Sequence, residues 1–417
     1  MNPNTRRRPS SFSADQPFQR RHRPDYVLLL LCVVLLVIGL IVVYSISPGL
    51  AAQKHVSENY FVTKQLIAIA LGFVMFGVAA VVPLNAWRHL QKPLLVGAIV
   101  ATLIALVLPA SAEYPAHRWI RFGGLSLQSV ELVKFVLLVS VAAFLVRQMR
   151  RGEMSDLKKT MQPLAIAMGV MGVIIAFLQK DLGSTGVIVA MMGAMAYVAG
   201  LPLKRIAQVA GIIAIGVVLL VIPSGYRRAR VANFVTPERD CQNTGYQACQ
   251  ALISVGSGGI FGLGLGKGVQ AFGYLPEAAN DSIFAIYAEK FGFLGTALLV
   301  GLFGVLFSRL VRIIERAPDD YTRLLVVGVL AWLSTQAIIN IGAMIGLLPL
   351  KGITLPFISY GGTSLIFVMA AIGLVFQVSR YTTYGINVQS KEGTPHDNSS
   401  YRRGDRRPHY AAVSRRP

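Results

Sequence analysis

The chain has 417 residues, of which 54% are hydrophobic and only 14% are charged, and its mean hydropathy is +0.57. A soluble protein of this length carries more charge on its surface, so the composition excludes an ordinary soluble domain. The apolar residues gather into blocks of roughly 17–25 residues, the length that crosses a bilayer core. The sequence therefore predicts an all-α, polytopic membrane protein.

The net charge of +21 is concentrated at the two ends of the chain. Six Arg precede residue 25, and eight Lys or Arg follow residue 379. Basic arms beside membrane spans usually set topology and attract anionic lipid headgroups. Because no zinc-ligand spacing, aromatic RNA-binding strand or recognition-helix pattern accompanies the charge, we expect no nucleic-acid partner.

Apolar runs separated by Pro, Gly and charged residues predict about ten transmembrane helices. The first run is long enough to span and lacks a small-residue cleavage site, so we expect it to remain as a helix rather than to be removed as a signal peptide. In chain order, the predicted helices cover 26–46, 63–83, 93–109, 127–146, 163–178, 184–201, 206–223, 282–308, 324–348 and 362–380.

The basic residues predict the orientation of these helices. With the N-terminus inside, the inner segments hold 27 of the 40 Lys and Arg, against 11 in the outer loops. This bias predicts that both termini are cytoplasmic. We expect a disordered basic tail over 1–24, a transmembrane domain over 25–383 and a second disordered basic tail over 384–417.

One outer segment, 224–281, is much longer than the other loops, and loops of this length are usually functional. Its stretch between Gly256 and Gly273 contains eight Gly. Such a stretch suits either a segment that packs closely against the bundle or a ligand, or a flexible connector. It is not a phosphate-binding P-loop, because Phe261 occupies the position of the first required Gly.

Asp281 lies where this segment re-enters the membrane, at the start of a predicted helix. A carboxylate there can be stabilised by the helix dipole, or be partly desolvated and made more basic. Asp is also a favoured N-cap residue, and the residue types alone favour that capping role.

Ionisable residues also occur inside the spans and, against the topology bias, in the outer loops. Glu131 and Lys134 are three residues apart on one helix face, so they can neutralise each other as a structural or a functional pair. Cations of the outer loops indicate an anionic ligand on that side, and a lipid-linked diphosphate fits them. These cations include Arg118, Arg227, Arg230 and Lys351.

Two of the three Cys lie in the long outer segment, eight residues apart. Under the predicted topology, Cys241 and Cys249 face an oxidising compartment, where disulfides persist. A turn at 243–245 could bring their Cα atoms within the bonding range of about 4.4–6.8 Å. The alternative is two unpaired residues, with Cys249 buried on a short helix that begins near Tyr246.

Several motifs, in this order and spacing, resemble the SEDS family (shape, elongation, division and sporulation), and within it the division branch. The resemblance covers about residues 26–380. Its motifs are RWI at 118–120, the Glu131/Lys134 pair in SVELVKF, DLG at 181–183, YRRAR at 226–230, GYQACQALISVGSGGIFGLGLG at 245–266, LPEAANDSIFAIYAEKFGFLG at 275–295 and KGITLPFISYGGTS at 351–364.

The resemblance implies a peptidoglycan glycosyltransferase that polymerises lipid II at the division septum of the inner membrane. Asp281 matches the family's essential acid, which implies a general base for the acceptor sugar hydroxyl. Substrate-binding roles are expected for the outer-face cations and for two polar residues of the matched motifs. The expected substrate-binding set is Arg118, Arg227, Arg230, Lys351, Gln247 and Ser359.

The implied partners are a class B penicillin-binding protein, which is the septal transpeptidase, and other divisome membrane proteins. No metal ligand is expected from the residues and no cofactor is firmly implied, although the reaction leaves room for a divalent cation. Three positions around the matched acid depart from the family's pattern, which has His, Thr and Phe where this chain has Ala279, Asn280 and Ser282. Lys290 replaces the second of two paired Glu, and Lys180 replaces a Pro.

Two other functions remain open from the residues. A lipid II flippase would need a charged passage through the bilayer, for which Glu131, Lys134 and Glu289 are candidates. A noncatalytic scaffold would recruit division proteins without needing Asp281. The concentration of charged residues at the outer face favours the polymerase over the flippase.

Overall fold

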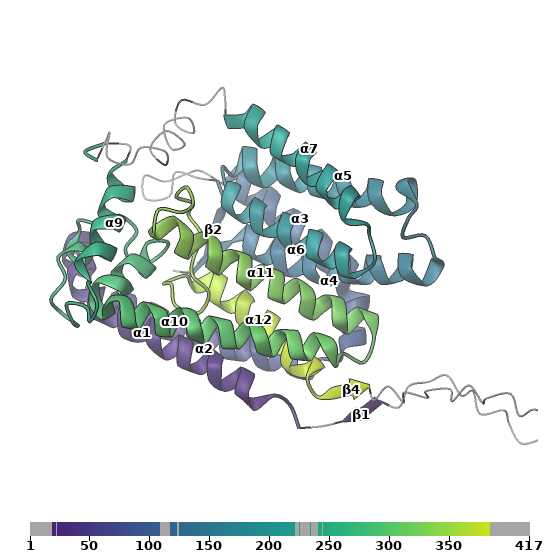
Figure 1. Ribbon diagram of the computed structural model, residues 1–417, viewed down its shortest axis with the longest axis horizontal. Helices are drawn as coiled ribbons and strands as arrows, with labels where there is room; N and C mark the ends of the chain where they lie inside the picture. The colour runs from purple at the N-terminus through teal and green to yellow at the C-terminus, as the bar shows by residue number, and fades with distance from the viewer. Residues whose placement is uncertain are drawn as a thin grey trace, which may run out of the picture. The chain divides into compact units, whose positions relative to one another are not determined.

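The computed structural model describes residues 19–21, 23–108, 117–122, 125–221, 225, 234, 241–243 and 245–383 (Figure 1). In chain order the elements are β1 (Gln19–Arg21), α1 (Tyr26–Lys54), α2 (Tyr60–Val81), α3 (Leu84–Val107), β2 (Trp119–Phe122), β3 (Leu125–Gln128), α4 (Ser129–Arg151), η1 (Leu157–Met161), α5 (Gln162–Gly172), η2 (Val173–Leu178), α6 (Leu182–Val198), α7 (Leu203–Val221), α9 (Tyr246–Ser257), η4 (Gln270–Phe272), α10 (Ile283–Glu315), α11 (Asp320–Met344), α12 (Gly362–Val378) and β4 (Tyr381–Thr383).

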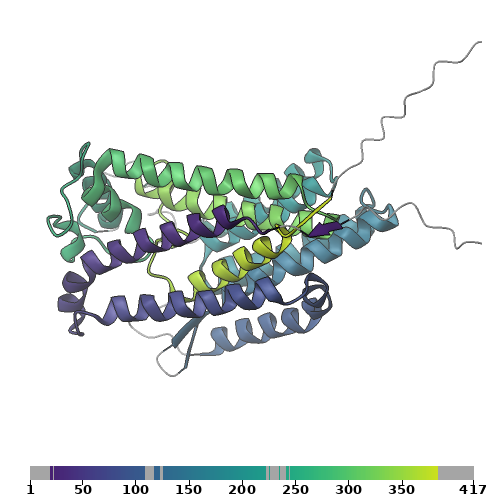
Figure 2. The same ribbon diagram turned by 90° about the horizontal axis from the view of Figure 1, so that it is seen from below.

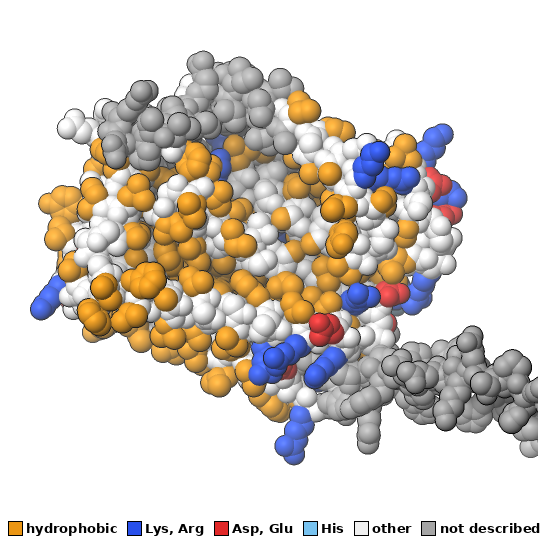
Figure 3. Space-filling view, viewed as in Figure 1, with side chains coloured by type: hydrophobic (Ala, Val, Ile, Leu, Met, Phe, Trp, Pro, Cys, Tyr) orange, Lys and Arg blue, Asp and Glu red, His pale blue; other side chains and the backbone are white. Residues whose placement is uncertain are grey.

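The prediction of an all-α polytopic membrane protein is confirmed. Each of the ten predicted runs overlaps a helix, and seven helical segments of the described chain are long and apolar enough to cross a membrane. α6 and α12 are shorter apolar helices. On the face in Figure 3, hydrophobic side chains cover most of the helical surface, and most of the basic ones gather towards the end that carries β1 and β4.

Two helix starts differ by more than about four residues from the predicted ones. α3 begins at Leu84 rather than 93, because Pro93 is accommodated inside the helix instead of opening it. The fifth span begins at Leu157 rather than 163, because the Asp156 carboxylate accepts the backbone N–H groups of Lys158 and Lys159 and so caps an earlier turn. That turn, η1, and the later η2 are π-helical and flank α5.

Both ends of the compact unit lie at the same end of the bundle. β1 pairs antiparallel with β4, with Gln19 opposite Thr383, and the backbone N–H of Asp25 donates to the Ser379 hydroxyl at 3.0 Å. The expectation that residues 1–24 are wholly disordered therefore fails for 19–21, whose backbone pairs with 381–383. Figure 2 shows α9 and the adjoining outer segment at the opposite end, as the odd number of spans that precede α9 requires.

Small residues allow the central helices to approach closely. A Cβ on Gly373 of α12 would lie 2.5 Å from the Phe76 carbonyl oxygen of α2, and one on Gly39 of α1 would lie 2.7 Å from the Phe357 carbonyl oxygen. Without a hydrophobic force between helices in lipid, such close packing is a main source of association. α4, α11 and α12 contribute much of the buried core.

The glycine-rich segment packs onto α10 and interrupts it. Gly292 has φ 63° and ψ −164°, which breaks the helical hydrogen bonds around it. The segment supplies replacements, because Leu263 N–H donates to Glu289 O at 2.9 Å and Gly264 N–H to Lys290 O at 3.0 Å. In return, Phe293 N–H donates to Gly259 O at 2.8 Å. Close packing, rather than a flexible connector, describes this segment.

Gly292→Ala should destabilise the protein, because φ 63° disfavours a Cβ and that Cβ would lie 2.6 Å from the Ile260 carbonyl oxygen. We expect a loss of about 1–3 kcal/mol in the free energy of unfolding. Equilibrium unfolding in mixed micelles measures this loss. The matched control is Gly301→Ala on the same helix, where a Cβ meets no atom within 4 Å. Equal effects of the two changes would contradict the proposed strain.

Candidate active site

Asp281 lies in the turn immediately before α10 and is partly exposed. The residue types favoured Asp281 as the N-cap of that helix, and the structure shows that this prediction is wrong. The N-cap is Ser282, whose hydroxyl donates to the Pro276 carbonyl oxygen at 2.9 Å and accepts from the Gln247 side-chain amide at 3.1 Å. The turn is tight, because Glu277 adopts a left-handed φ of 51° and its carbonyl accepts the N–H groups of Asn280 and Ser282. The Asp281 carboxylate is therefore not used to cap α10.

The backbone around Asp281 is held from α11. Asn340, which is only 1% exposed, donates from its side-chain amide to the carbonyl oxygens of Asp281 and Ile353, both at 2.7 Å. One buried amide thus joins the turn before α10 to the loop before α12. Asn340 was not among the predicted site residues. Its spacing of four residues from Gln336, on one helix face, was the available signal.

Ser359 holds the preceding residue of the turn. Its hydroxyl donates to the Asn280 carbonyl oxygen at 2.6 Å and accepts from Leu355 N–H at 2.7 Å. Tyr360 N–H donates to the Ala279 carbonyl oxygen at 2.8 Å. Ser359 is 4% exposed, and both functions of its hydroxyl are used within the protein. It supports the turn, and the predicted contact of Ser359 with substrate stays a prediction.

A chain of contacts brings three outer-face motifs together. A Cβ on Gly352 would lie 3.6 Å from Oδ2 of Asp281, so the 351–364 motif lines one side of the carboxylate. A Cβ on Gly183 would lie 3.2 Å from Cβ of Lys351, which places the DLG motif against the same loop. Asp281 therefore lies beside Gly352, the residue that directly follows Lys351 in this loop.

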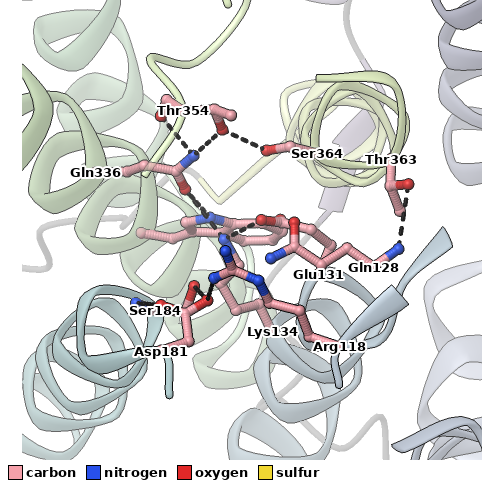
Figure 4. Close-up of polar contacts among 11 residues, drawn as sticks. Arg118, Gln128, Glu131, Lys134, Asp181, Ser184, Gln336, Thr354, Thr363 and Ser364 are labelled. Carbon is pink, nitrogen blue, oxygen red and sulfur yellow. Dashed lines mark hydrogen bonds and ion pairs between the residues drawn. The ribbon is translucent and has the colours of Figure 1, made fainter. Parts of the chain in front are cut away.

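Arg118 joins this cluster through Asp181. Its Nη1 lies 3.4 Å from Oδ2 of Asp181, a carboxylate that is 4% exposed and caps α6 by accepting the N–H and the hydroxyl of Ser184, each at 2.9 Å (Figure 4). Because Asp181 is buried, it holds the guanidinium, whose side chain is 26% exposed, in one direction. Asp181 was not among the predicted site residues, although an Asp directly before an apolar run is an N-cap pattern.

Glu131 and Lys134 form an ion pair of 2.8 Å inside the bundle. Lys134 also donates to Oε1 of Gln336 at 3.2 Å, and its Nζ lies 5.1 Å from the centre of the Trp332 ring. Gln336 in turn donates to the carbonyl oxygen of Thr354 at 2.9 Å. Figure 4 shows this network linking α4, α11 and the loop before α12. The pair is thus connected to the same loop that contacts Asp281.

α9 supports the site from the long outer segment. Gln247 on α9 donates to Ser282, and Ser254 donates to the Ala285 carbonyl oxygen at 3.0 Å. Cys241 and Cys249 form a disulfide with a Cα–Cα distance of 5.6 Å, and Cys249 is buried on α9. The bond ties the residues before α9 to its first turn.

The remaining predicted cations, Arg227 and Arg230, lie outside the described residues. Within the described ranges, no three His, Cys, Asp or Glu lie close enough together to hold a metal ion.

These features define a class: a polytopic helical membrane protein with a carboxylate and cations gathered at the end of the bundle opposite the termini. Residues 26–384 match the family model for FtsW, RodA and SpoVE, described as "Cell cycle protein". The chain belongs to this family, which confirms the predicted SEDS membership.

Curated relatives match over nearly their whole length. The chain is 37% identical over 380 residues to "Probable peptidoglycan glycosyltransferase FtsW" of Saccharophagus degradans, covering 89% of this chain and 96% of the relative. It is 36% identical over 368 residues to "Stage V sporulation protein E" of Bacillus subtilis, covering 88% and 99%. Several other relatives that carry the FtsW name match at 34–38% identity, which supports the division branch.

A solved structure described as "Structural coordination of polymerization and crosslinking by a peptidoglycan synthase complex" is similar to this fold. Its matched chain has a TM-score of 0.69 and 26% identity, with coverage of 86% of this chain and 98% of that chain.

Breaking the Glu131–Lys134 pair should destabilise the bundle. Glu131→Gln or Lys134→Met alone leaves an uncompensated buried group, which should cost about 3–5 kcal/mol. The double variant should lose less than the sum of the two single losses. Unfolding in mixed micelles, analysed as a double-mutant cycle, measures the coupling.

The control cycle uses Glu153→Gln and Lys159→Met at an exposed ion pair, where solvent screens the charges and no coupling is expected. Strictly additive effects at Glu131 and Lys134 would contradict an interacting buried pair.

The disulfide should protect Cys241 and Cys249 from thiol reagents. In a Cys32→Ser background, an impermeant maleimide should label cells that have been treated with a reductant and should leave untreated cells unlabelled. The same background with both loop Cys changed to Ser should stay unlabelled throughout. Ready labelling before reduction would show that the bond does not form in the cell.

Proposed function

We propose that this chain is a peptidoglycan glycosyltransferase that polymerises lipid II at the division septum of the inner membrane, with both termini cytoplasmic. Its similarity to relatives named for this activity, over 96% of the length of one of them, supports the proposal. The observation that carries it is the placement of Asp281, whose turn is clamped by Asn340 while the carboxylate lies against the 351–364 loop.

In the proposed reaction, the Asp281 carboxylate accepts the proton of the acceptor sugar hydroxyl. The resulting oxygen attacks the anomeric carbon of the donor, a new glycosidic bond forms, and the bond to the lipid diphosphate breaks. A positioned general base typically contributes about 10²–10⁴-fold to such a reaction. A base on a turn held by backbone hydrogen bonds keeps a constant position relative to its substrate.

The leaving diphosphate gains charge as its bond to the sugar breaks, so nearby cations stabilise it. Arg118 and Lys351 belong to the cluster of contacts around Asp281 and are the proposed ligands. The Asp181 carboxylate orients the Arg118 guanidinium and leaves other N–H groups for the diphosphate. Arg227 and Arg230 are proposed to add charge to the same site.

Two of the departures from the family pattern, Asn280 and Ser282, make internal contacts. The Asn280 side chain donates to the Glu277 carboxylate, and Ser282 is bonded to Pro276 and Gln247. Glu289 accepts the N–H groups of Val269 and Gln270 at 3.1 and 3.3 Å, so it holds the segment after the glycines. None of these contacts uses the Asp281 carboxylate, and the proposed base is retained.

We further propose that the chain works with a class B penicillin-binding protein, the septal transpeptidase, and with other divisome membrane proteins. The similar peptidoglycan synthase complex, whose description couples polymerisation to crosslinking, supports such a pairing. The flippase alternative has less support, because Glu131 and Lys134 form an ion pair and Lys134 also donates to Gln336, so the charges of this pair are bonded within the bundle. Segments 1–24 and 384–417 are proposed to be basic cytoplasmic tails, apart from the strand at 19–21.

Asp281→Asn should lower lipid II polymerisation at least about 100-fold, because the amide cannot accept the proton. The measurement is glycan chain extension from purified lipid II by the full-length protein, with and without a class B partner. Glu58→Gln, at an exposed acid of the same face, is the matched control and should polymerise normally.

Near-normal polymerisation by Asp281→Asn would refute its assignment as the base. Translocation of lipid II without any glycan product from the unaltered protein would favour a flippase. Growth supported by Asp281→Asn in cells that lack the unaltered protein would favour the scaffold.

A further inference from the structure

A cavity of about 390 Å³ lies between α5, α6 and α7. Its size falls within the range of about 300–1,000 Å³ found for sites of small ligands. Its lining is apolar apart from one phenol, and the residues that shape it include Leu164, Met168, Gly193, Tyr197, Ile206 and Val209.

The cavity is separate from the candidate active site. It is lined by the first part of α5, the last part of α6 and the first part of α7, which adjoin the connections on the side of the termini. Asp181, which joins the active-site cluster, precedes the opposite end of α6. The cavity therefore belongs to the half of the membrane next to the termini.

Two exposed cations lie close in the chain to residues that line this cavity. Lys158 lies three residues before Met161 and Lys204 directly follows Leu203, and both of these neighbours line the cavity. Within the described part of the chain, neither Lys158 nor Lys204 has an ion-pair partner.

The other charged groups nearby are already engaged. Lys159 pairs with Glu153 at 2.6 Å, and Arg205 donates to the Ser155 carbonyl oxygen. The Asp156 carboxylate accepts two backbone N–H groups of η1. The charge that remains for a ligand at this mouth is positive.

We propose that this cavity binds an acyl chain of an anionic phospholipid from the leaflet on the side of the termini. The apolar lining takes the hydrocarbon chain, and Lys158 and Lys204 bind the phosphate at the level of the headgroups. Tyr197, an amphipathic side chain that is 58% exposed, lines the cavity and offers a hydroxyl to the same headgroup. The π-helical η1 beside the cavity is a distortion that often accompanies functional sites.

The test is native mass spectrometry of the purified full-length protein in detergent, titrated with phosphatidylglycerol or with phosphatidylcholine of the same acyl chains. We expect retention of phosphatidylglycerol over phosphatidylcholine. Lys158→Gln combined with Lys204→Gln should weaken phosphatidylglycerol binding about 30-fold, since each surface cation contributes about one factor of five. Lys92→Gln combined with Arg312→Gln removes two exposed cations away from the cavity and should have no such effect.

A second pair of variants tests the cavity itself. A Cβ on Gly193 would lie 3.8 Å from Cγ2 of Ile206, another lining residue, which is an ordinary van der Waals distance. Gly193→Leu should therefore fit, fill the cavity and abolish retention of the lipid. Gly169→Leu adds the same side chain on α5 at a position with open space and outside the lining, and should bind as the unaltered protein does. A size-exclusion profile in the same detergent checks that each variant stays folded.

Equal retention of the two phospholipids, or equal loss in Gly193→Leu and Gly169→Leu, would overturn the proposal. Displacement of phosphatidylglycerol by a polyprenyl phosphate alone would assign the cavity to the substrate lipid instead. Release of the lipid when a class B partner is added would assign it to a partner helix. These readouts measure binding, so they do not depend on the proposed polymerase activity.

Discussion

The two hydrogen bonds donated by the buried amide of Asn340 are the constraint on which the candidate site depends. A turn by itself does not fix the position of a carboxylate, because it lacks the repeating hydrogen bonds of a helix. By bonding the carbonyl oxygens of Asp281 and Ile353, Asn340 fixes that turn and the loop beside it to the rigid α11. The Ser359 hydroxyl likewise donates to the carbonyl oxygen of Asn280. Gln247 on α9 donates to the Ser282 hydroxyl on the other side of Asp281. The turn that carries the carboxylate is thus held by hydrogen bonds from side chains of α9, α11 and the 351–364 loop.

The break in α10 shows how the outer segment reaches this site without leaving buried backbone groups unbonded. Inside a membrane bundle, an unpaired N–H or carbonyl is costly, so an interrupted helix needs replacement partners. The glycine-rich segment provides them at Glu289 and Lys290, and only residues without a Cβ allow so close an approach. Glu289 then uses its carboxylate on the residues that follow the glycines. The two ends of the bundle consequently differ, with a polar, tightly bonded site at one and an apolar cavity bordered by cations at the other.

The elements that could be predicted from sequence are those decided by short-range patterns. The apolar runs predicted ten helices, because a segment that spans a bilayer must be mostly apolar and long enough to cross its core. The three-residue spacing of Glu131 and Lys134 placed them on one face, where they do form an ion pair. Asp281 was identified from its motif and its place between loop and helix, and the spacing of Cys241 and Cys249 allowed the bridge that the structure contains.

Tertiary structure decided which partner each polar group has. Asn340 and Asp281 are 59 residues apart, Arg118 and Asp181 are 63 apart, and Ser359 and Asn280 are 79 apart. No periodicity in the sequence extends over such separations, because helix packing sets which loops meet. The choice of Ser282 over Asp281 as N-cap had the same origin, since contacts from Pro276 and Gln247 outweigh the intrinsic preference of Asp for that position. Sequence by itself thus determined the spans and the chemical groups available, whereas packing between distant segments decided which of those groups form a site.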